Sequence, residues 1–172
     1  SVKNVVNIKK IGKFSLVELF HGPTLAFKDI AMQPIGNIYD EFNKSNNKKI
    51  NVIVATSGDT GSAAISALNG KSNLNVFVLH PDKKISNIQR RLMTTVESKN
   101  VFNIALKGNF DDCQKIVKDM FIDQEFRKKI NMSGVNSINW ARIIFQIVYY
   151  FFVGLKFLNK PINFSVPTGN FG

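Results

Sequence analysis

The segment Asn51–Ala64, with the sequence NVIVATSGDTGSAA, constrains the fold more than any other part of the chain. It opens on the apolar run Val52–Ala55, which is typical of a buried strand. A turn rich in glycine and hydroxyl side chains follows, and a helical pattern then continues until it stops at Asn69 and Gly70. A strand, a tight turn and a helix in this order predict one unit of a parallel sheet that is covered by helices.

The turn in this segment is also a candidate anion site. Backbone N–H groups point out of the first turn of a helix, and the helix dipole favours negative charge there. The alternative is an ordinary helix start, in which Asp59 or Thr60 caps the helix with its side chain. A cap needs one such residue, whereas the run Thr56–Ser62 consists entirely of small, polar or acidic residues. The sequence therefore favours a ligand-binding loop.

A second segment, HGPTLAFKD at His21–Asp29, places Lys28 at the end of a small, apolar and sharply turned stretch. Burial disfavours the charged form of a lysine, so such an amine can lose its proton more easily than a surface amine. A neutral amine can attack an aldehyde and form a Schiff base. On this run alone, a lysine that reaches solvent is the better interpretation, because buried lysines are rare. Considered together with the other segments, however, a buried and reactive lysine is favoured.

Two further segments carry residue types that bind anions. Asn136–Arg142, NSINWAR, combines hydroxyl, amide and guanidinium groups at the start of a long apolar helix. Arginine suits bidentate contacts with carboxylate or phosphate, although a capped helix with a surface arginine explains this segment equally well. Phe164–Gly172, FSVPTGNFG, predicts a short strand that enters a Gly-x-x-Gly loop. Successive N–H groups of such a loop can cradle a phosphate, but alone the pattern is more often a plain turn.

Together with KGNFDDCQ at Lys107–Gln114, these segments resemble the threonine synthases whose active-site lysine lies in an HGPT-x-A-F-K-D run. Matching motifs occur in the same order from Leu19 to the last residue, so the resemblance covers most of the chain. It implies the fold of the tryptophan synthase β-like group of pyridoxal-phosphate (PLP) enzymes, which is fold type II. We therefore expect an α/β fold, here truncated, with a parallel sheet and helices on both faces.

The resemblance implies a cytoplasmic, PLP-dependent lyase of threonine biosynthesis, which converts O-phosphohomoserine and water to threonine and phosphate. Lys28 would be the catalytic residue, forming the Schiff base and moving protons. The implied cofactor contacts are Lys28, Ser57, Asp59, Gly169, Asn170, Phe171 and Gly172. The implied substrate contacts are Ser57, Gly58, Thr60, Gly61, Ser137, Asn139 and Arg142.

The resemblance also implies two domains. Residues 1–28 would belong to a large PLP domain, 29–136 would form a small α/β domain, and 137–172 would return to the large domain and end in the phosphate loop. We expect the chain to be an internal fragment, because family members continue on both sides of the matching region. Two alternatives stay open: a catalytically incompetent fragment that keeps the small-domain fold, or a related PLP dehydratase or β-replacement enzyme.

The apolar patterns predict the remaining elements. Pro34 predicts a kink near Ile30–Pro34, because proline removes a helical hydrogen bond. The predicted strands are Phe14–Phe20, one each at Val52 and Val76, Val101–Leu106, an extended piece at Asn131–Asn136 and a last strand at Asn163. The predicted helices are Asp29–Asn43, one starting at Gly61, Asn87–Ser98, Phe110–Phe121, a short one near Gln124 and a long one at Trp140.

The composition of the chain argues against several other classes of function. The formal net charge of +11 raises the question of nucleic acid, but the lysines occur as scattered pairs without interleaved aromatic residues. A solvated basic surface that attracts anionic ligands is the better interpretation, so we expect no nucleic-acid partner. Cys113, the single cysteine, excludes a disulfide within the chain and is expected to pack on its helix. Two histidines without metal-ligand spacing argue against a metal site.

The apolar stretch Trp140–Leu158 raises the question of a membrane. Arg142, Gln146 and Lys156 interrupt it, so a buried helix is favoured over a membrane span. Because we expect the chain to be truncated, we also expect part of this helix to be left uncovered. An exposed apolar patch with a tendency to self-association is therefore predicted. Ser1–Gly12 has no long apolar core of the kind found in a signal peptide.

Overall fold

The computed structural model describes residues 5–46, 48–136, 139–158 and 160–167. The helices and strands of these residues, in chain order, are β1 (Asn7–Ile11), β2 (Phe14–Glu18), α1 (Asp29–Asn46), β3 (Ile50–Ala55), α2 (Asp59–Leu68), β4 (Leu74–Pro81), α3 (Asn87–Thr94), β5 (Val101–Leu106), α4 (Phe110–Ile122), α5 (Gln124–Lys129), β6 (Met132–Gly134) and α6 (Trp140–Lys156).

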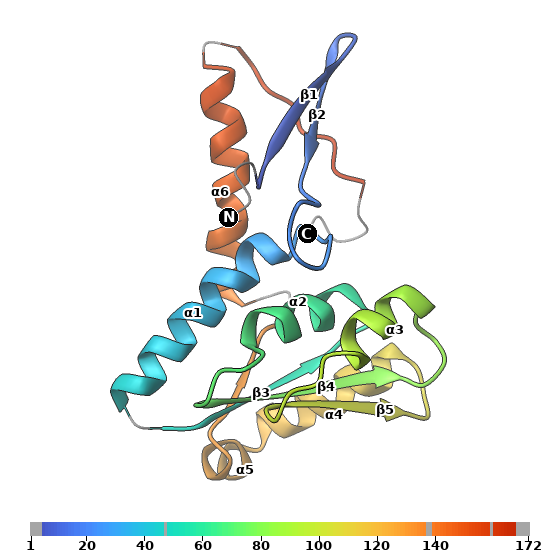
Figure 1. Ribbon diagram of the computed structural model, residues 1–172, viewed down its shortest axis with the longest axis vertical. Coiled ribbons are helices and arrows are strands. Elements are labelled where there is room, and N and C mark those ends of the chain that lie inside the picture. The colour runs from blue at the N-terminus through green and yellow to red at the C-terminus, as the bar shows by residue number, and fades with distance from the viewer. Residues whose placement is uncertain (1–4, 47, 137–138, 159, 168–172) are drawn as a thin grey trace.

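A parallel sheet with the strand order β5-β4-β3-β6 organises the chain. Val52 of β3 lies opposite Val76 of β4 on one side and Ser133 of β6 on the other. Figure 1 shows α2 and α3 on one face of this sheet and α4 and α5 on the other face. The predicted α/β class, with helices on both faces of a parallel sheet, is confirmed.

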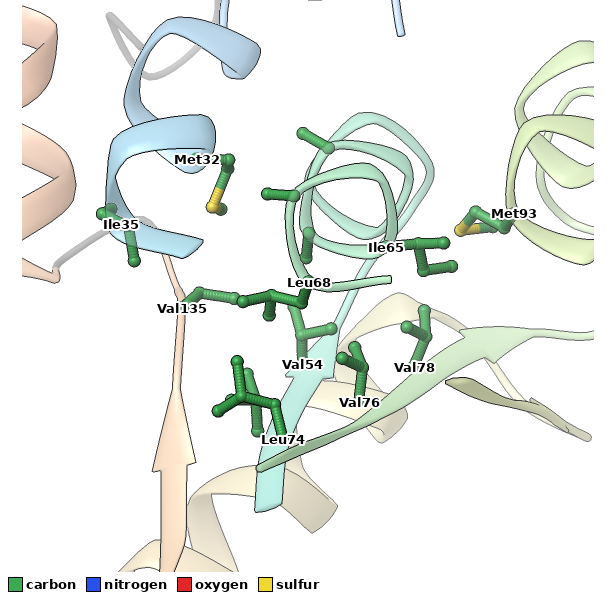
Figure 2. Close-up of a cluster of buried hydrophobic side chains, with 14 of the residues drawn as sticks. Met32, Ile35, Val54, Ile65, Leu68, Leu74, Val76, Val78, Met93 and Val135 are labelled. Atoms are coloured by element: carbon green, nitrogen blue, oxygen red, sulfur yellow. The ribbon is translucent and has the colours of Figure 1, made fainter. Parts of the chain in front are cut away.

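Strand β3 packs against apolar clusters on both faces of the sheet, which explains its continuous apolar run. Val52 and Val54 point to the cluster under α1 and α2, whereas Ile53 points to a second cluster with Cys113 and Val117 of α4. The predicted packing of Cys113 is therefore confirmed. Figure 2 shows the first cluster, whose labelled members point toward one another: Met32, Ile35, Val54, Ile65, Leu68, Leu74, Val76, Val78, Met93 and Val135.

An antiparallel hairpin of β1 and β2 lies apart from the sheet, on the side of α6 (Figure 1). Sequence analysis predicted β2 but missed β1. Gly12, with φ +56°, allows the tight turn between the two strands. Glu18 at the end of β2 accepts hydrogen bonds from Asn7 at 3.0 Å and from His21 at 3.2 Å, and it pairs with Lys9 at 2.6 Å. These contacts fasten the hairpin to the turn that precedes α1.

Two expected details differ from the structure, and a third stays a prediction. Helix α1 is continuous through Pro34, and continuity alone does not test the kink predicted near Ile30–Pro34. Helix α3 ends at Thr94 rather than at Ser98. The strand predicted at Asn163 is wrong, because residues 161–167 contain no strand. A strand requires a hydrogen-bonded neighbour, and this segment instead contacts α6, where the ring of Phe164 meets Tyr150 edge-on at 5.0 Å.

Helix α6 packs on α1 with its buried residues, which are Arg142, Tyr149 and Val153. The opposite side is apolar and exposed, and we call it the α6 apolar face: Trp140, Ile143, Ile144, Ile147, Val148, Phe151, Phe152 and Leu155. The predicted exposed patch is thereby confirmed. Across the described part of the chain, no helix combines the length and the apolar character needed to cross a membrane.

Candidate active site

A pocket of about 170 Å³ opens at the carboxyl ends of β3 and β6. The strand order changes direction here, because β4 and β5 extend from one side of β3 while β6 lies on its other side. Open parallel sheets bind their ligands at such a point. The pocket is lined by Lys28, Ala55, Thr56, Ser57, Thr60, Phe110, Gln114, Asn136 and Arg142.

A closed turn positions Lys28 just before α1. The carboxylate of Asp29 accepts hydrogen bonds from the backbone N–H of Thr24 at 2.8 Å and from its hydroxyl at 2.7 Å. A Cβ on Gly22 would lie 2.4 Å from the same carboxylate, so the turn closes only around glycine. Leu25 adopts φ +59°, which a sharp turn at this point requires. The HGPT sequence thus turns the chain so that Lys28 faces the pocket.

The amine of Lys28 lies among groups with opposing effects on its charge. Its side chain is 18% exposed, and burial lowers the pKa of the amine below its ordinary value. The positive charge of Arg142 lowers this pKa further, whereas the carboxylate of Asp59, 3.7 Å from Nζ, raises it. The net direction is downward, as the sequence-based reasoning on Lys28 expected.

The loop between β3 and α2 is organised by Thr56. Its hydroxyl oxygen accepts hydrogen bonds from the N–H groups of Gly58 at 2.9 Å and Gly61 at 3.0 Å. Helix α2 begins after Gly58 without any side-chain cap, so the alternative of a cap by Asp59 or Thr60 is wrong. Ser57 and Thr60 line the pocket, whereas the N–H groups of Gly58 and Gly61 are directed to Thr56.

Arg142 is buried at the start of α6, with only 1% of its surface exposed. Its Nε donates a hydrogen bond to Gln146 at 3.0 Å, but Nη1 has no partner among the described residues. Burial lowers the pKa of the guanidinium. The alternative of a surface arginine is wrong. A buried N–H without an acceptor is costly, so this arginine suits an anion entering the pocket.

Asn139 and Asn136 have different places in the structure. The side-chain oxygen of Asn139 accepts from the N–H groups of Ala141 and Arg142, and its amide donates to Gly134. Asn139 therefore caps α6 and connects it to β6. Asn136 lines the pocket, although sequence reasoning did not select it. The positions Ser137, Gly169, Asn170, Phe171 and Gly172 lie outside the described residues.

Helix α4 contributes two lining residues that sequence reasoning also missed, Phe110 and Gln114. Asn109 starts this helix with a capping box, in which its side chain accepts from the N–H of Asp112 and the Asp112 carboxylate accepts from the N–H of Asn109. The sequence signal that contains both residues is the KGNFDDCQ stretch, a motif to which the sequence alone assigns no role.

The lining of the pocket is suited to negatively charged ligands. Among the described residues that line it, Lys28 and Arg142 are the charged ones, and the carboxylate of Asp59, which is not among them, lies 3.7 Å from Nζ of Lys28. Ser57, Thr60, Gln114 and Asn136 supply neutral hydrogen-bonding groups. Within the described ranges, no three histidine, cysteine or acidic side chains come together in a way that could hold a metal ion.

These features define a parallel α/β protein with a lysine amine and a buried guanidinium in one anion-suited pocket at the switch point of its sheet. No family model matches the chain. It is 51% identical to threonine synthase of Pseudomonas aeruginosa over 159 aligned positions, with 91% of this chain covered. It is 48% identical to the Saccharomyces cerevisiae enzyme over 183 aligned positions, with 99% of this chain covered. The chain belongs to the threonine synthase family.

The chain spans about a third of the length of these curated relatives, 34% and 35% respectively. Among solved structures, it is similar to the PLP-bound threonine synthase of Brucella melitensis, with a TM-score of 0.87 and 46% identity, covering 97% of this chain and 37% of that one. An O-ureido-L-serine synthase shares the fold at 13% identity, with a TM-score of 0.62, over 92% of this chain and 50% of that one.

Proposed function

We propose that the whole protein is a cytoplasmic, PLP-dependent lyase of fold type II that converts O-phosphohomoserine and water to threonine and phosphate. The observation that carries the proposal is one pocket shared by the Lys28 amine and by a buried Arg142 whose Nη1 has no partner within the described ranges. Homology to threonine synthases over almost the entire chain supports the same reaction. Product analysis separates this function from that of a related dehydratase or β-replacement enzyme.

The residues of the pocket fit PLP and a phosphorylated amino acid. Both ligands are anions, and the described lining supplies two cationic side chains, of which Lys28 also faces the carboxylate of Asp59 at 3.7 Å. Lys28, partly buried and with a lowered pKa, has the amine that the PLP aldehyde needs. When bound, PLP supplies an electron sink for the carbon chemistry.

The chain's own residues supply position, charge and proton transfer. We assign proton transfer to Lys28, because an amine with a lowered pKa is a usable acid and base near neutral pH. Arg142 holds the substrate phosphate and neutralises its charge as it leaves. Ser57 and Thr60, which line the pocket, are assigned to the substrate together with Ser137. Gly58, Gly61 and Asn139 are assigned to the same substrate site as residues that shape it, since their polar groups bond to Thr56 or cap α6. Asp59 and the loop 169–172 are assigned to the cofactor.

The division into domains belongs to the same proposal. Residues 29–136 contain the whole parallel sheet with its helices, whereas the hairpin of β1 and β2 and most of α6 lie to one side of it (Figure 1). We assign residues 1–28 and 137–172 to the larger domain. The pocket then lies where the two domains meet, since Lys28 and Arg142 come from the flanking pieces and Ser57 comes from the sheet.

The test is a PLP titration of the full-length protein, followed by borohydride reduction and peptide mapping. We expect the reduced adduct on Lys28 and its loss in Lys28→Ala. Lys99→Ala is the matched control, because Lys99 is exposed and lies before β5, at the opposite end of the strands. A phosphate-release assay with O-phosphohomoserine follows, with threonine as the expected product. An adduct spread evenly over surface lysines, or no threonine from the wild type, would overturn the proposal.

A further inference from the structure

Gln89 of α3 connects the candidate site to a helix that does not line the pocket. Its Nε2 donates a hydrogen bond of 2.7 Å to Oδ1 of Asp59, and the other oxygen of this carboxylate lies 3.7 Å from the Lys28 amine. The hydroxyl of Ser86, which starts α3, donates to Oε1 of Gln89 at 3.0 Å. A polar chain therefore runs from Ser86 through Gln89 and Asp59 to Lys28.

The same amide is packed against the loop after β3. A Cβ on Gly58 would lie 2.3 Å from Cδ of Gln89 and 2.5 Å from its Nε2. Gly58 has φ +150°, a conformation that side chains disfavour. The Gln89 amide thus occupies space that only a glycine leaves open. Helix α3 therefore packs closely against the loop between β3 and α2 at Gly58.

We propose that Gln89 is a positioning residue that holds the Asp59 carboxylate toward Lys28 and so sets the charge state of that amine. The proposal rests on the proposed function, because it concerns the same lysine. It adds a residue to which the sequence motifs gave no role. It also makes α3 part of the machinery of the site, although no residue of α3 lines the pocket.

The charge state of the Lys28 amine depends on the groups that face it. Asp59 approaches it from α2 and Arg142 from α6, and these are the charged groups that act on it. Arg142 and burial favour the neutral amine, which alone can attack an aldehyde, while Asp59 favours the ammonium. The Asp59 side chain is 44% exposed, so without the Gln89 donor it is free to turn toward water. Loss of this donor therefore shifts the balance toward the neutral amine.

The test measures the amine directly and needs neither PLP nor turnover. Full-length protein prepared without PLP is acetylated competitively at several pH values, and the labelling of Lys28 is read by mass spectrometry. Gln89→Met keeps the packing on Gly58 and removes the donor. Each half-unit fall in the pKa raises the labelling rate of Lys28 about threefold at a pH well below that pKa. We expect a rise of at least this size in Gln89→Met.

Gln33→Met is the matched control, because Gln33 donates a comparable hydrogen bond, of 3.3 Å to Ser66, and does not contact Asp59. Its Lys28 profile should equal that of the wild type. Should Gln89→Met fail to fold, Gln89→Asn keeps the amide but is one carbon too short to reach Asp59, and the same shift is expected. An unchanged Lys28 profile in the folded variant overturns the proposal. Failure of the proposed function would show separately, as absence of the PLP adduct on wild-type Lys28.

Discussion

For Arg142, the residue type predicted the kind of ligand contact but not the burial of the side chain. An arginine in NSINWAR suggested an anion contact, but its burial was not predictable, because it results from the packing of α6 on α1. The same limit applies to Lys28, whose environment includes residues far away in sequence. Thr56 and Gln89 were not selected because their roles are hydrogen bonds, from Gly58 to Thr56 and from Gln89 to the distant Asp59, for which no residue pattern is diagnostic.

The Nη1 group of Arg142, which lacks a partner in the part of the chain that the structure describes, predicts opposite effects on stability and on binding. An arginine that is buried without a paired anion carries a desolvation cost, which an apolar side chain of similar size does not have. We expect Arg142→Met to raise the free energy of unfolding by about 1 kcal/mol, or to leave it unchanged, in urea denaturation. The same variant should lose the thermal stabilisation that inorganic phosphate gives to the wild type. Marked destabilisation would indicate that Arg142 is structural, and Arg90→Met, at an exposed position, controls for loss of charge.

Glu18 predicts how the hairpin responds to pH. Its hydrogen bonds to Lys9, Asn7 and His21 hold the pKa of the carboxylate below its ordinary value of 4.5, with Lys9 as the largest cause. A carboxylate with a lowered pKa stabilises the fold above its unfolded-state pKa and loses this effect as the pH falls through its folded-state pKa. We expect amide exchange in β1 and β2 to accelerate in that acidic range. Glu18→Gln should remove this pH dependence, and persistence of the dependence would contradict the assignment.

At the scale of elements, prediction succeeded where the determinants are local. The unit of β3, its loop and α2 could be predicted from one continuous segment, because apolar runs, glycines and helix stops are all short-range signals. The strand expected at Asn163 failed because a strand depends on a partner that the local pattern does not reveal. For the same reason β1 was missed, although its partner β2 follows directly and pairs Ile11 with Phe14.

The contact between α1 and α2 depends on Gly36. A Cβ at this position would lie 2.5 Å from the backbone oxygen of Ala67, which cannot move without shifting α2. We expect Gly36→Ala to lower the free energy of unfolding by roughly 1–3 kcal/mol, although alanine is the better helix former. Gly154→Ala in α6 is the matched control, because no atom lies within 4 Å of its added Cβ. It should be stabilising by about 0.5–1 kcal/mol in the same urea experiment. Equal effects of the two changes would refute the packing argument.

At the scale of the whole molecule, the candidate site is a product of strand order. Periodicity predicted that β3, β4, β5 and β6 exist, but not that β6 would return to the free side of β3. The pairing of β6 with β3 creates the switch point of the sheet. It also places α4 on one face of the sheet, so that Gln114 of α4 and Ser57 line the same pocket. Sequence motifs thus identified many members of the site as separate segments, and the topology explains why they converge.

The α6 apolar face predicts how the 172-residue chain associates in solution. Ile147 and Phe151, four residues apart on this helix, are 52% and 67% exposed and have apolar neighbours on the same side. Contiguous exposed apolar surface favours association, so we expect the chain to self-associate with increasing concentration in sedimentation velocity. The double variant Ile147→Glu, Phe151→Glu should shift the chain toward the monomer.

Ile88→Glu is the control for this experiment. Ile88 is 75% exposed on α3, away from α6, so the substitution adds the same kind of charge without changing the α6 apolar face. It should leave the association unchanged, whereas a general effect of charge would reduce association in both variants. A wild-type chain that stays monomeric at high concentration would show that the α6 apolar face does not drive association by itself. Because the face is continuous over the length of α6, its effect should scale with the apolar area removed, and single substitutions should be intermediate.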